Sequence, residues 1–353
     1  MAEKKRTKVG AGRRMSGRKS PLPKRGKSST SRSGTGAEEA PKRSPLPPLA
    51  APLSAYLAAP GLEDELQREL GDVVHRHGRL LLAPGKPRSS IWSQDVWLDT
   101  KLARIDSIGD AAKVLRGIQR NWVGYSHHEH RRMTLLSKRL PPIKERVWPF
   151  PCSLPDADLG AYTLLDRNTL LYSPTCRSPF PNGEVRFVDN LNPPSRAYRK
   201  LWEVFTLCQV MPQRGDRCID MGATPGGWTW VLAELGANIR SVDKAMLHPD
   251  VAALPNVKVK LQSAFSVDPK LVENPYDWFF SDVICYPERL LAMVQRWLDA
   301  GAARRFVCTI KFQSKTDYKT IDAFAKIPGS RMLHLHHNRH ELTWIKLDDE
   351  LDI

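Results

Sequence analysis

Residues 218–228 have the composition of a turn that binds a nucleotide cofactor. They read Cys-Ile-Asp-Met-Gly-Ala-Thr-Pro-Gly-Gly-Trp, an apolar run followed by a glycine-rich turn and a helix start. Glycine leaves room where the backbone passes close to a ligand. In a doubly wound sheet this turn receives the nucleotide, and an acid about 20 residues on, here Asp243, binds ribose hydroxyls. A purely structural strand, turn and helix is the alternative. The residues of the turn are Gly222, Ala223, Thr224, Pro225, Gly226, Gly227 and Trp228.

Asp282 and Lys311 could supply acid–base chemistry beside that turn. Each comes directly after a strand-like apolar run. Ligands bind outside the carboxyl ends of the strands in a parallel sheet, so we expect both side chains at the same edge as Gly222 and Asp243. An amine and a carboxylate at one edge can align a hydroxyl group and remove its proton.

This region resembles the FtsJ-like ribose 2′-O-methyltransferases, whose cofactor is S-adenosylmethionine (SAM). The loop has the form D-x-G-x-x-P-G-G-W rather than the dinucleotide spacing G-x-G-x-x-G, and S-R-A-x-x-K-L precedes it. The resemblance covers about residues 195–347 and matches Lys200, Asp282, Lys311 and Glu341 to the K-D-K-E tetrad of that family. Taken alone, Lys200 would be an ordinary surface lysine. Within the family, the segments S-P-F-P-x-G and R-x-E-L-T are similar to those of bacterial enzymes that 2′-O-methylate a cytidine of 23S rRNA.

The resemblance implies an α/β fold with a Rossmann-like methyltransferase domain, whose mostly parallel sheet has an antiparallel last strand. It also implies methyl transfer from SAM to a ribose 2′-hydroxyl of RNA, without a metal. In this mechanism Lys311 removes the proton, Asp282 orients Lys311, and Lys200 with Glu341 positions the hydroxyl. The residues alone leave open which lysine loses its proton. Ser195 and Asp282 are carried over as further cofactor-binding residues.

Ser263 departs from the family pattern. Members usually carry an acid after the third strand, where it accepts a hydrogen bond from the adenine amino group, but residues 261–265 read Leu-Gln-Ser-Ala-Phe. A hydroxyl oxygen accepts such a bond more weakly than a carboxylate does. We therefore expect weaker SAM binding, with Asp268 as a possible substitute for the missing acid.

Three parts of the chain are predicted to position these residues: a tail at 1–50, a smaller α+β domain at 51–185 and the methyltransferase domain at 186–353. The α+β domain is expected to bind RNA. Its Y-x-x-x-P-G-x-E-x-x-L-x-x-E-L segment resembles the N-terminal region of rRNA-methylating enzymes, a THUMP-type fold. Its expected elements are a helix at 61–70 and strands at 55–60, 75–83, 92–98 and 161–172. Residues 178–187 are expected to form a Pro/Asn-Gly turn followed by an edge strand.

The tail carries most of the positive charge. Residues 1–43 hold 14 Lys and Arg against 3 Glu, within a net charge of +16 for the whole chain. Such a segment buries too little apolar surface to fold, so we expect it to be disordered. An electrostatic arm for RNA phosphates is favoured over a leader without a specific role, and a transit peptide would need an amphipathic face. No run of 18 apolar residues predicts a membrane span.

Histidines and cysteines give little indication of a metal. His127, His128 and His130 adjoin Arg131 and Arg132, which would repel a cation, so an RNA-facing basic surface or a solvated face is favoured. The six cysteines contain no C-x-x-C pair, which indicates reduced thiols and a cytoplasmic location.

Two other functions remain open at this point. An mRNA-cap 2′-O-methyltransferase uses the same tetrad, so the catalytic core does not exclude it. A non-catalytic RNA-binding or ribosome-assembly protein could also use this fold, although an intact tetrad argues against that. A monomer is expected.

Overall fold

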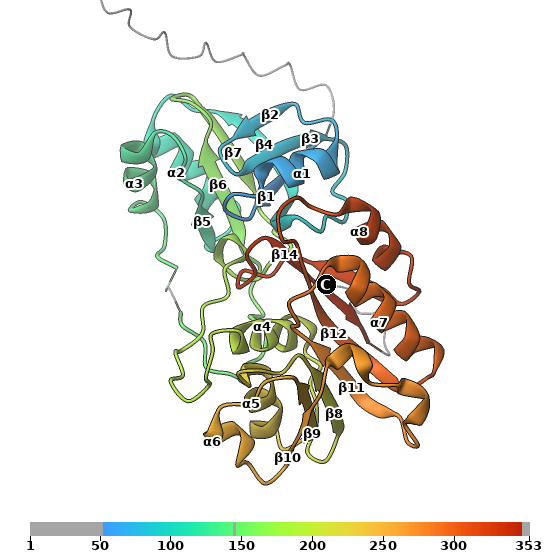
Figure 1. The fold of residues 1–353 in the computed structure, drawn as a ribbon. Coiled ribbons are helices and arrows are strands. Elements are labelled where there is room, and N and C mark those ends of the chain that lie inside the picture. Colours follow the sequence, from blue (N-terminus) through green and yellow to red (C-terminus); the bar gives the residue numbers. More distant parts are fainter. Residues whose placement is uncertain (1–51, 144–145, 348–353) are drawn as a thin grey trace, which may run out of the picture. The chain divides into compact units, whose positions relative to one another are not determined.

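The structure is a computed structural model that describes residues 52–143 and 146–347 (Figure 1). The predicted disordered tail lies outside these residues. Two seven-stranded sheets organise the described part of the chain, and both belong to one compact unit, Leu46–Ile353. The domain limits at residues 50 and 185 stay predictions. Among the described residues, no helix has the length and apolar character that crossing a membrane requires.

The first sheet is mostly antiparallel, and only β5 and β6 pair in parallel. Its strand order is β2-β3-β1-β4-β7-β6-β5. The strands are β1 (Leu53–Ala58), β2 (His75–His77), β3 (Leu80–Pro84), β4 (Ser93–Arg104), β5 (Trp122–Gly124), β6 (Gly160–Leu164) and β7 (Thr169–Ser173). The helices are α1 (Glu63–Leu70), α2 (Ile108–Arg116) and α3 (His130–Ser137).

Three predictions for this region were wrong in detail. Residues 75–83 form the two strands of a hairpin, β2 and β3, because Gly78 turns the chain with a φ of +62°. Residues 161–172 likewise form a hairpin of β6 and β7. The turn predicted within residues 178–187 is present, but the edge strand expected after it does not form. Asn182 and Gly183 have positive φ in the 3₁₀ turn η1 (Pro181–Gly183), and Phe187 makes a single bridge to Trp148.

The second sheet has the predicted mixed arrangement. Strands β10, β9, β8, β11 and β12 pair in parallel in that order, and β14 runs antiparallel to β12 and β13. Because β8 pairs with both β9 and β11, the strand order reverses at β8, where such sheets bind ligands. The strands are β8 (Arg217–Met221), β9 (Asn238–Asp243), β10 (Val257–Leu261), β11 (Tyr276–Ser281), β12 (Ala303–Lys311), β13 (Ser330–Leu333) and β14 (Glu341–Lys346).

Helices cover both faces of this sheet (Figure 1). On one face Phe205 of α4 packs against Trp278 and Phe280 at ring distances of 6.1 and 6.2 Å. On the other face Phe279 packs against Trp297 of α7 at 4.9 Å. Burying each such side chain contributes roughly 1.5–3 kcal/mol. The helices are α4 (Tyr198–Cys208), α5 (Gly227–Glu234), α6 (Pro249–Ala252), α7 (Pro287–Asp299) and α8 (Tyr318–Ala325), and the 3₁₀ turns are η2 (Ala264–Ser266) and η3 (Pro269–Leu271).

Candidate active site

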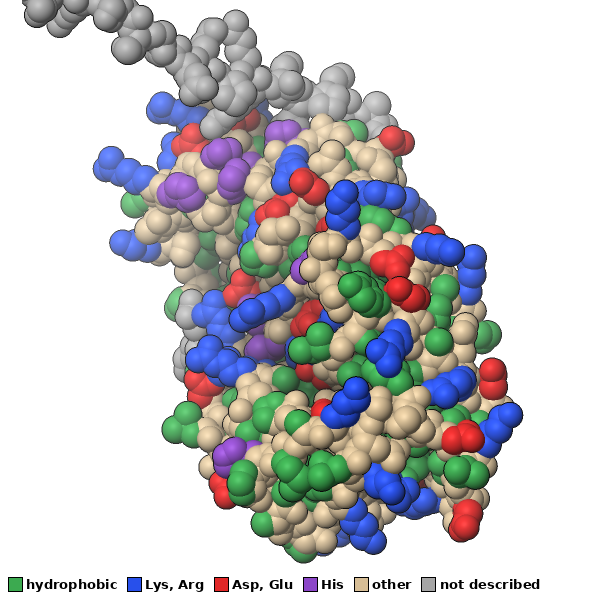
Figure 2. Space-filling view, in the orientation of Figure 1, with side chains coloured by type: hydrophobic (Ala, Val, Ile, Leu, Met, Phe, Trp, Pro, Cys, Tyr) green, Lys and Arg blue, Asp and Glu red, His purple; other side chains and the backbone are tan. Residues whose placement is uncertain are grey.

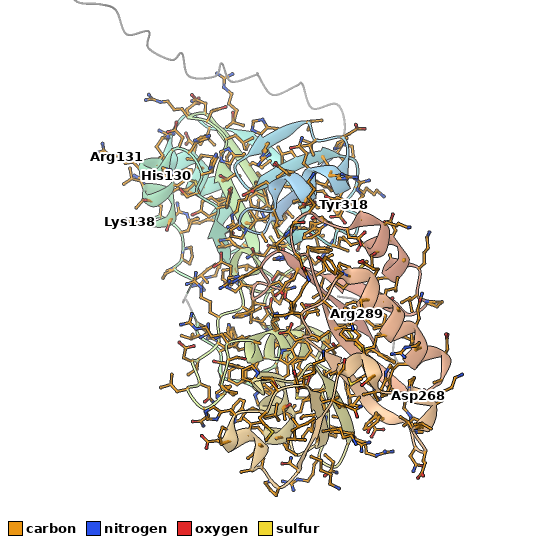
Figure 3. All side chains as sticks on the ribbon, in the orientation of Figure 1. His130, Arg131, Lys138, Asp268, Arg289 and Tyr318 are labelled. Carbon is orange, nitrogen blue, oxygen red and sulfur yellow. The ribbon has the colours of Figure 1, made fainter. Side chains whose placement is uncertain are left out.

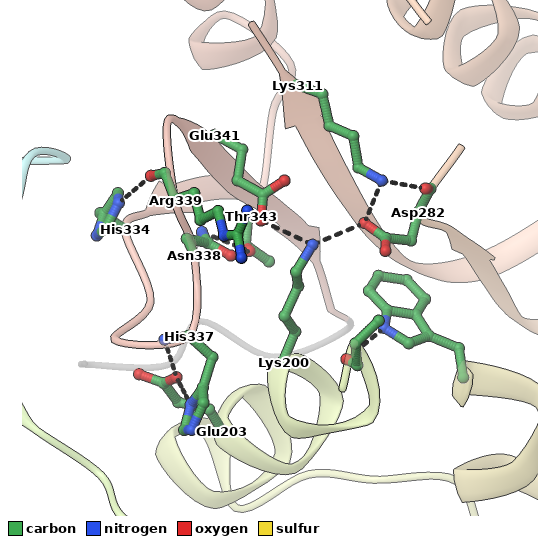
Figure 4. Close-up of polar contacts among 12 residues, drawn as sticks. Lys200, Glu203, Asp282, Lys311, His334, His337, Asn338, Arg339, Glu341 and Thr343 are labelled. Atoms are coloured by element: carbon green, nitrogen blue, oxygen red, sulfur yellow. Dashed lines mark hydrogen bonds and ion pairs between the residues drawn. The ribbon is translucent and has the colours of Figure 1, made fainter. Parts of the chain in front are cut away.

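The four predicted tetrad residues lie together at the carboxyl edge of the second sheet (Figure 4). Lys200 Nζ lies 3.0 Å from Asp282 Oδ1 and 2.7 Å from Glu341 Oε1. Lys311 Nζ lies 3.1 Å from the same Asp282 oxygen. The four side chains are only 10–19% exposed, so they form a continuous and largely buried chain of ion pairs.

Four different elements bring these side chains to one place. Asp282 follows β11 and Lys311 ends β12, so both lie at the same edge because these strands are parallel. Glu341 begins the antiparallel β14 and is the register partner of Lys311. Lys200 lies in the first turn of α4.

The two lysines differ in their surroundings. Burial lowers the pKa of Lys200, but the carboxylates of Asp282 and Glu341 together raise it by more, so it lies above the ordinary value of 10.5. Lys200 therefore stays charged at neutral pH. Lys311 contacts one carboxylate, and its Nζ also donates to the backbone carbonyl of Asp282 at 2.5 Å. It is also the more exposed of the two, at 19% against 10%.

The glycine-rich turn fits closely against its neighbours. Gly222 has a φ of +83°, and a Cβ there would lie 2.6 Å from Val283 Cβ. A Cβ on Gly227 would lie 2.4 Å from Ser195 Oγ, so the predicted cofactor residue Ser195 adjoins the start of α5. Trp228 Nε1 donates to Ala197 O at 2.9 Å and so ties the turn to the start of α4. Glycine is therefore required at Gly222 and Gly227 because neighbouring residues of the protein itself fill the space that a side chain would occupy.

Asp243 supports the same turn. Its Oδ2 accepts a hydrogen bond from Thr224 N at 3.0 Å, and its Oδ1 accepts one from Ala245 N at 3.1 Å. An ionised carboxylate offers about four acceptor sites, so each oxygen can still accept from a ribose hydroxyl. Ala223 is buried and Pro225 is exposed beside Thr224. These residues fit a nucleoside cofactor.

Ser263 lies just beyond the carboxyl end of β10, while Asp268 lies further along the loop. The Ser263 hydroxyl accepts from Phe265 N at 3.3 Å and caps η2. Asp268 is exposed (Figure 3), and its carboxylate accepts from Lys270 N at 3.0 Å. Arg289 of α7, labelled in the same figure, lies over the Phe265 ring at 3.8 Å. This stacking links the start of α7 to the loop that carries Ser263.

Glu203 is a buried acid of the site that sequence reasoning missed. It is 2% exposed, and it accepts hydrogen bonds from His336 N at 2.7 Å, His337 N at 3.0 Å and His337 Nδ1 at 2.6 Å. It thereby fastens the loop that leads to Glu341 onto the helix that carries Lys200 (Figure 4). Its partners lie more than 130 positions away in the chain, so the sequence around Glu203 gives no signal of this role.

A second buried acid, Asp220, lies beneath the glycine-rich turn. Its Oδ2 accepts from Thr229 Oγ1 at 2.7 Å, and the Thr229 hydroxyl also lies 2.8 Å from Ser241 Oγ. Burial raises the pKa of Asp220 to about 7, and the Thr229 hydrogen bond opposes this effect only in part. The carboxyl group links β8, α5 and β9.

The region around the first sheet also touches the tetrad loops. Thr316 Oγ1, in the segment after Lys311, donates to Glu65 Oε1 at 2.7 Å. Trp92 packs against Phe312 and His340 at ring distances of 6.0 and 6.4 Å. Residues before α2 thus support the segments that flank Lys311 and Glu341.

Histidine side chains gather over the first sheet on the face shown in Figure 2. His127 and His128 lie 4.1 Å apart between ring centroids, and His77 lies 5.1 and 5.2 Å from them. Burial and the neighbouring His128 lower the pKa of His75. Within residues 52–143 and 146–347, no group of three or more His, Cys, Asp or Glu side chains is arranged to hold a metal ion.

Comparisons with known proteins give one matching family model and several relatives that cover part of the chain. Residues 193–297 match the family model described as FtsJ-like methyltransferase. A protein named ribosomal RNA large subunit methyltransferase M, from Halorhodospira halophila, is 31% identical over 178 residues, which cover 47% of this chain and 51% of that protein. The protein of the same name from Laribacter hongkongensis is 31% identical over 188 residues, covering 48% and 52%. The chain spans about half the length of these relatives.

The solved structure of TrmN from Thermus thermophilus resembles this chain at 13% identity, over 83% of this chain and 98% of that one. Its TM-score is 0.32, and we draw nothing from a likeness at this level.

Proposed function

We propose that this chain, whose residues 193–297 form an FtsJ-like methyltransferase domain, transfers the methyl group of SAM to a ribose 2′-hydroxyl of RNA. One observation carries this proposal. A continuous chain of ion pairs, with distances of 2.7–3.1 Å between paired atoms, joins Lys200, Asp282, Lys311 and Glu341. A tetrad of these types beside a glycine-rich nucleotide turn suits a reaction that needs alignment and removal of one proton.

The residues of the turn fit SAM. Gly222, Gly226 and Gly227 let the turn pack closely against Val283, Val251 and Ser195, and Asp243 keeps acceptor positions for the ribose hydroxyls. When bound, SAM supplies a methyl group that its sulfonium has already activated. The task of the chain is then to orient a ribose hydroxyl and to take up its proton.

Lys311 is the base in this proposal. Its neutral amine would accept the 2′-hydroxyl proton as the methyl group passes to the 2′-oxygen, with the methyl–sulfur bond of SAM broken and S-adenosylhomocysteine as the leaving group. Asp282 orients the amine through the 3.1 Å contact. Lys200, held charged between Asp282 and Glu341, donates to the ribose oxygen and keeps the two carboxylates in place.

The substrate we propose is a cytidine of large-subunit (23S) rRNA, bound in part by the N-terminal α+β region. The S-P-F-P-x-G and R-x-E-L-T segments support this assignment, as do the printed names of the two relatives. The six free cysteines suit a cytoplasmic enzyme. An mRNA-cap 2′-O-methyltransferase would use the same chemistry on a different RNA.

The test is transfer of labelled methyl from SAM to unmodified large-subunit rRNA and to capped RNA, followed by mapping of ribose methylation. Lys311→Ala should lower the rate by about 10²-fold or more, the usual contribution of general base catalysis, and should retain SAM binding. Lys319→Ala removes an exposed lysine on α8 and should match the wild type. Transfer to capped RNA alone would favour the cap enzyme, whereas no transfer to either RNA would refute the proposed activity.

A further inference from the structure

Tyr286 presents an unusually exposed aromatic ring near the tetrad. Tyr286 is 59% exposed, and Ile284, two positions before it, is 79% exposed. The intervening Cys285 is buried, and Val283 packs against Gly222. Ile284 and Tyr286 are thus the two exposed side chains of this segment, on either side of a buried residue. Among the described residues, the Tyr286 side chain makes no hydrogen bond, ring contact or cation–π contact.

Tyr286 occupies a helix position where tyrosine does not stabilise the helix. It is the N-cap residue of α7, with an extended φ of −66° and ψ of 144°, and its side chain makes no capping hydrogen bond. Ser, Thr, Asp and Asn are preferred at such positions, where they stabilise the helix by about 1 kcal/mol.

The backbone of Tyr286 is nevertheless well fixed. Its carbonyl accepts hydrogen bonds from Arg289 N at 3.0 Å and Leu290 N at 3.3 Å. Pro287 occupies the first turn, and Arg289 lies over Phe265 at 3.8 Å. The exposed ring therefore stands on a rigid support, which lowers the entropy cost of binding a flat ligand.

Tyr286 also lies at the edge of the sheet where the tetrad lies. Helix α7 connects the parallel strands β11 and β12, so its N-terminus is at their carboxyl ends. Tyr286 follows Asp282 by four residues, and an extended chain of that length spans at most about 14 Å. A ribose at Asp282 and Lys311 would place the adjoining nucleobases within reach of this ring.

We propose that Tyr286, with Ile284 beside it, stacks on an unpaired nucleobase of the substrate RNA next to the target ribose, and so acts as a positioning residue. This inference rests on the proposed function. RNA-modifying proteins reach bases mainly in single-stranded regions, where bases stack on aromatic side chains. Removal of one base–aromatic stack typically weakens binding by about 5- to 150-fold.

Three variants separate stacking from folding. Tyr286→Phe keeps the ring and should retain the KM for RNA. Tyr286→Ser removes the ring but introduces a preferred N-cap residue. It should therefore raise the melting temperature while it raises the KM for RNA about 5- to 150-fold, with little change in SAM affinity. Leu271→Ala is the matched control, because Leu271 is 81% exposed on η3 and lies nearer in the chain to the amino end of β11 than to the carboxyl end of β10. It should leave both values unchanged.

RNA with a single abasic site near the target nucleotide completes the test. At the stacked position, loss of the base should weaken the wild type to the level of Tyr286→Ser and should affect Tyr286→Ser itself very little. The stacking proposal is overturned if Tyr286→Ser binds RNA as the wild type does, or if the abasic site weakens both proteins equally. Absence of methyl transfer by the wild type would instead refute the proposed function.

Discussion

Lys200 Nζ and Asp282 Oδ1 lie 3.0 Å apart although 82 positions separate them in the chain. The same amine lies 2.7 Å from Glu341 Oε1, so one cation is shared by two largely buried carboxylates. Two like charges in such a site repel each other strongly unless a cation lies between them. Lys200 therefore has a structural role in addition to the role that we propose for it in methyl transfer.

Replacement of Lys200 by methionine should expose this structural role. Lys200→Met keeps the length of the side chain but leaves Asp282 and Glu341 without their shared cation. Breaking a buried pair in this way typically costs about 3–5 kcal/mol, which urea unfolding at neutral pH would measure. The double variant Lys200→Met/Glu341→Gln removes one of the carboxylates as well and should recover part of that stability without recovering methyl transfer. Equal stability of the two variants would show that the carboxylates do not repel each other.

The close fit of Gly222 against Val283 leads to a second prediction. Gly222→Ala forces a non-glycine residue to a φ of +83° and brings its Cβ to 2.6 Å from Val283 Cβ. Gly215→Ala is the matched control, since Gly215 has a φ of +91° but nothing within 4 Å of the added Cβ. The control should lose about 1–2 kcal/mol of stability, and Gly222→Ala about 1–3 kcal/mol more. Calorimetric titration should show weaker SAM binding in Gly222→Ala alone.

Residues that follow predicted strands were the easiest to place from sequence. Asp282 and Lys311 come directly after apolar runs, and the rule that ligands meet the carboxyl ends of parallel strands was sufficient to bring them together. Glu341 needed the added expectation of an antiparallel last strand, which β14 confirms. The predicted roles of these residues remain proposals.

Three structural features were not predicted from the sequence: the role of Glu203, strand β13 and the hairpin at Gly78. Glu203 acts through His336 and His337, more than 130 positions away, and nothing near Glu203 in the sequence indicates that loop. Strand β13 is short, and its four residues are all half-buried, so it lacks a clear alternating pattern. Residues 75–83 were predicted as a single strand because the apolar run at 80–83 is a strong strand signal, whereas Gly78 alone is a weak turn signal.

The buried carboxyl of Asp220 should make stability depend on pH. Burial raises its pKa from 3.8 to about 7, so the folded protein holds this proton more tightly than the unfolded chain does. Between about pH 4 and 7 the contribution of Asp220 to the free energy of unfolding therefore falls as the pH rises. At 1.36 kcal/mol for each unit, the full change is ~4 kcal/mol.

Asp220→Asn tests this dependence because the amide does not titrate and its oxygen can still accept from Thr229. Urea unfolding across that pH range should show that the wild type loses stability relative to the variant as the pH rises. A difference that stays constant with pH would mean that Asp220 is charged throughout, contrary to the burial argument.

Ser263 stands where related enzymes carry an acid that contacts the adenine of SAM, and replacing it should improve SAM binding. Ser263 caps η2 by accepting from Phe265 N at 3.3 Å, and aspartate is an equally good capping residue. Ser263→Asp should therefore preserve the local fold and supply the stronger acceptor that the adenine amino group finds in the related family. Charge-assisted hydrogen bonds are roughly twice as strong as neutral ones, and a gain of about 1.4 kcal/mol corresponds to tenfold tighter SAM binding.

Asp268→Ser is the companion variant. Because the Asp268 carboxylate is exposed and already accepts from Lys270 N, its replacement should leave SAM affinity unchanged. If Asp268→Ser weakens SAM binding and Ser263→Asp does not strengthen it, then Asp268 is the acid that contacts the adenine, and the loop after β10 must rearrange when the cofactor binds. If Ser263→Asp alone changes the affinity, the serine occupies the adenine position and limits how tightly this chain holds SAM.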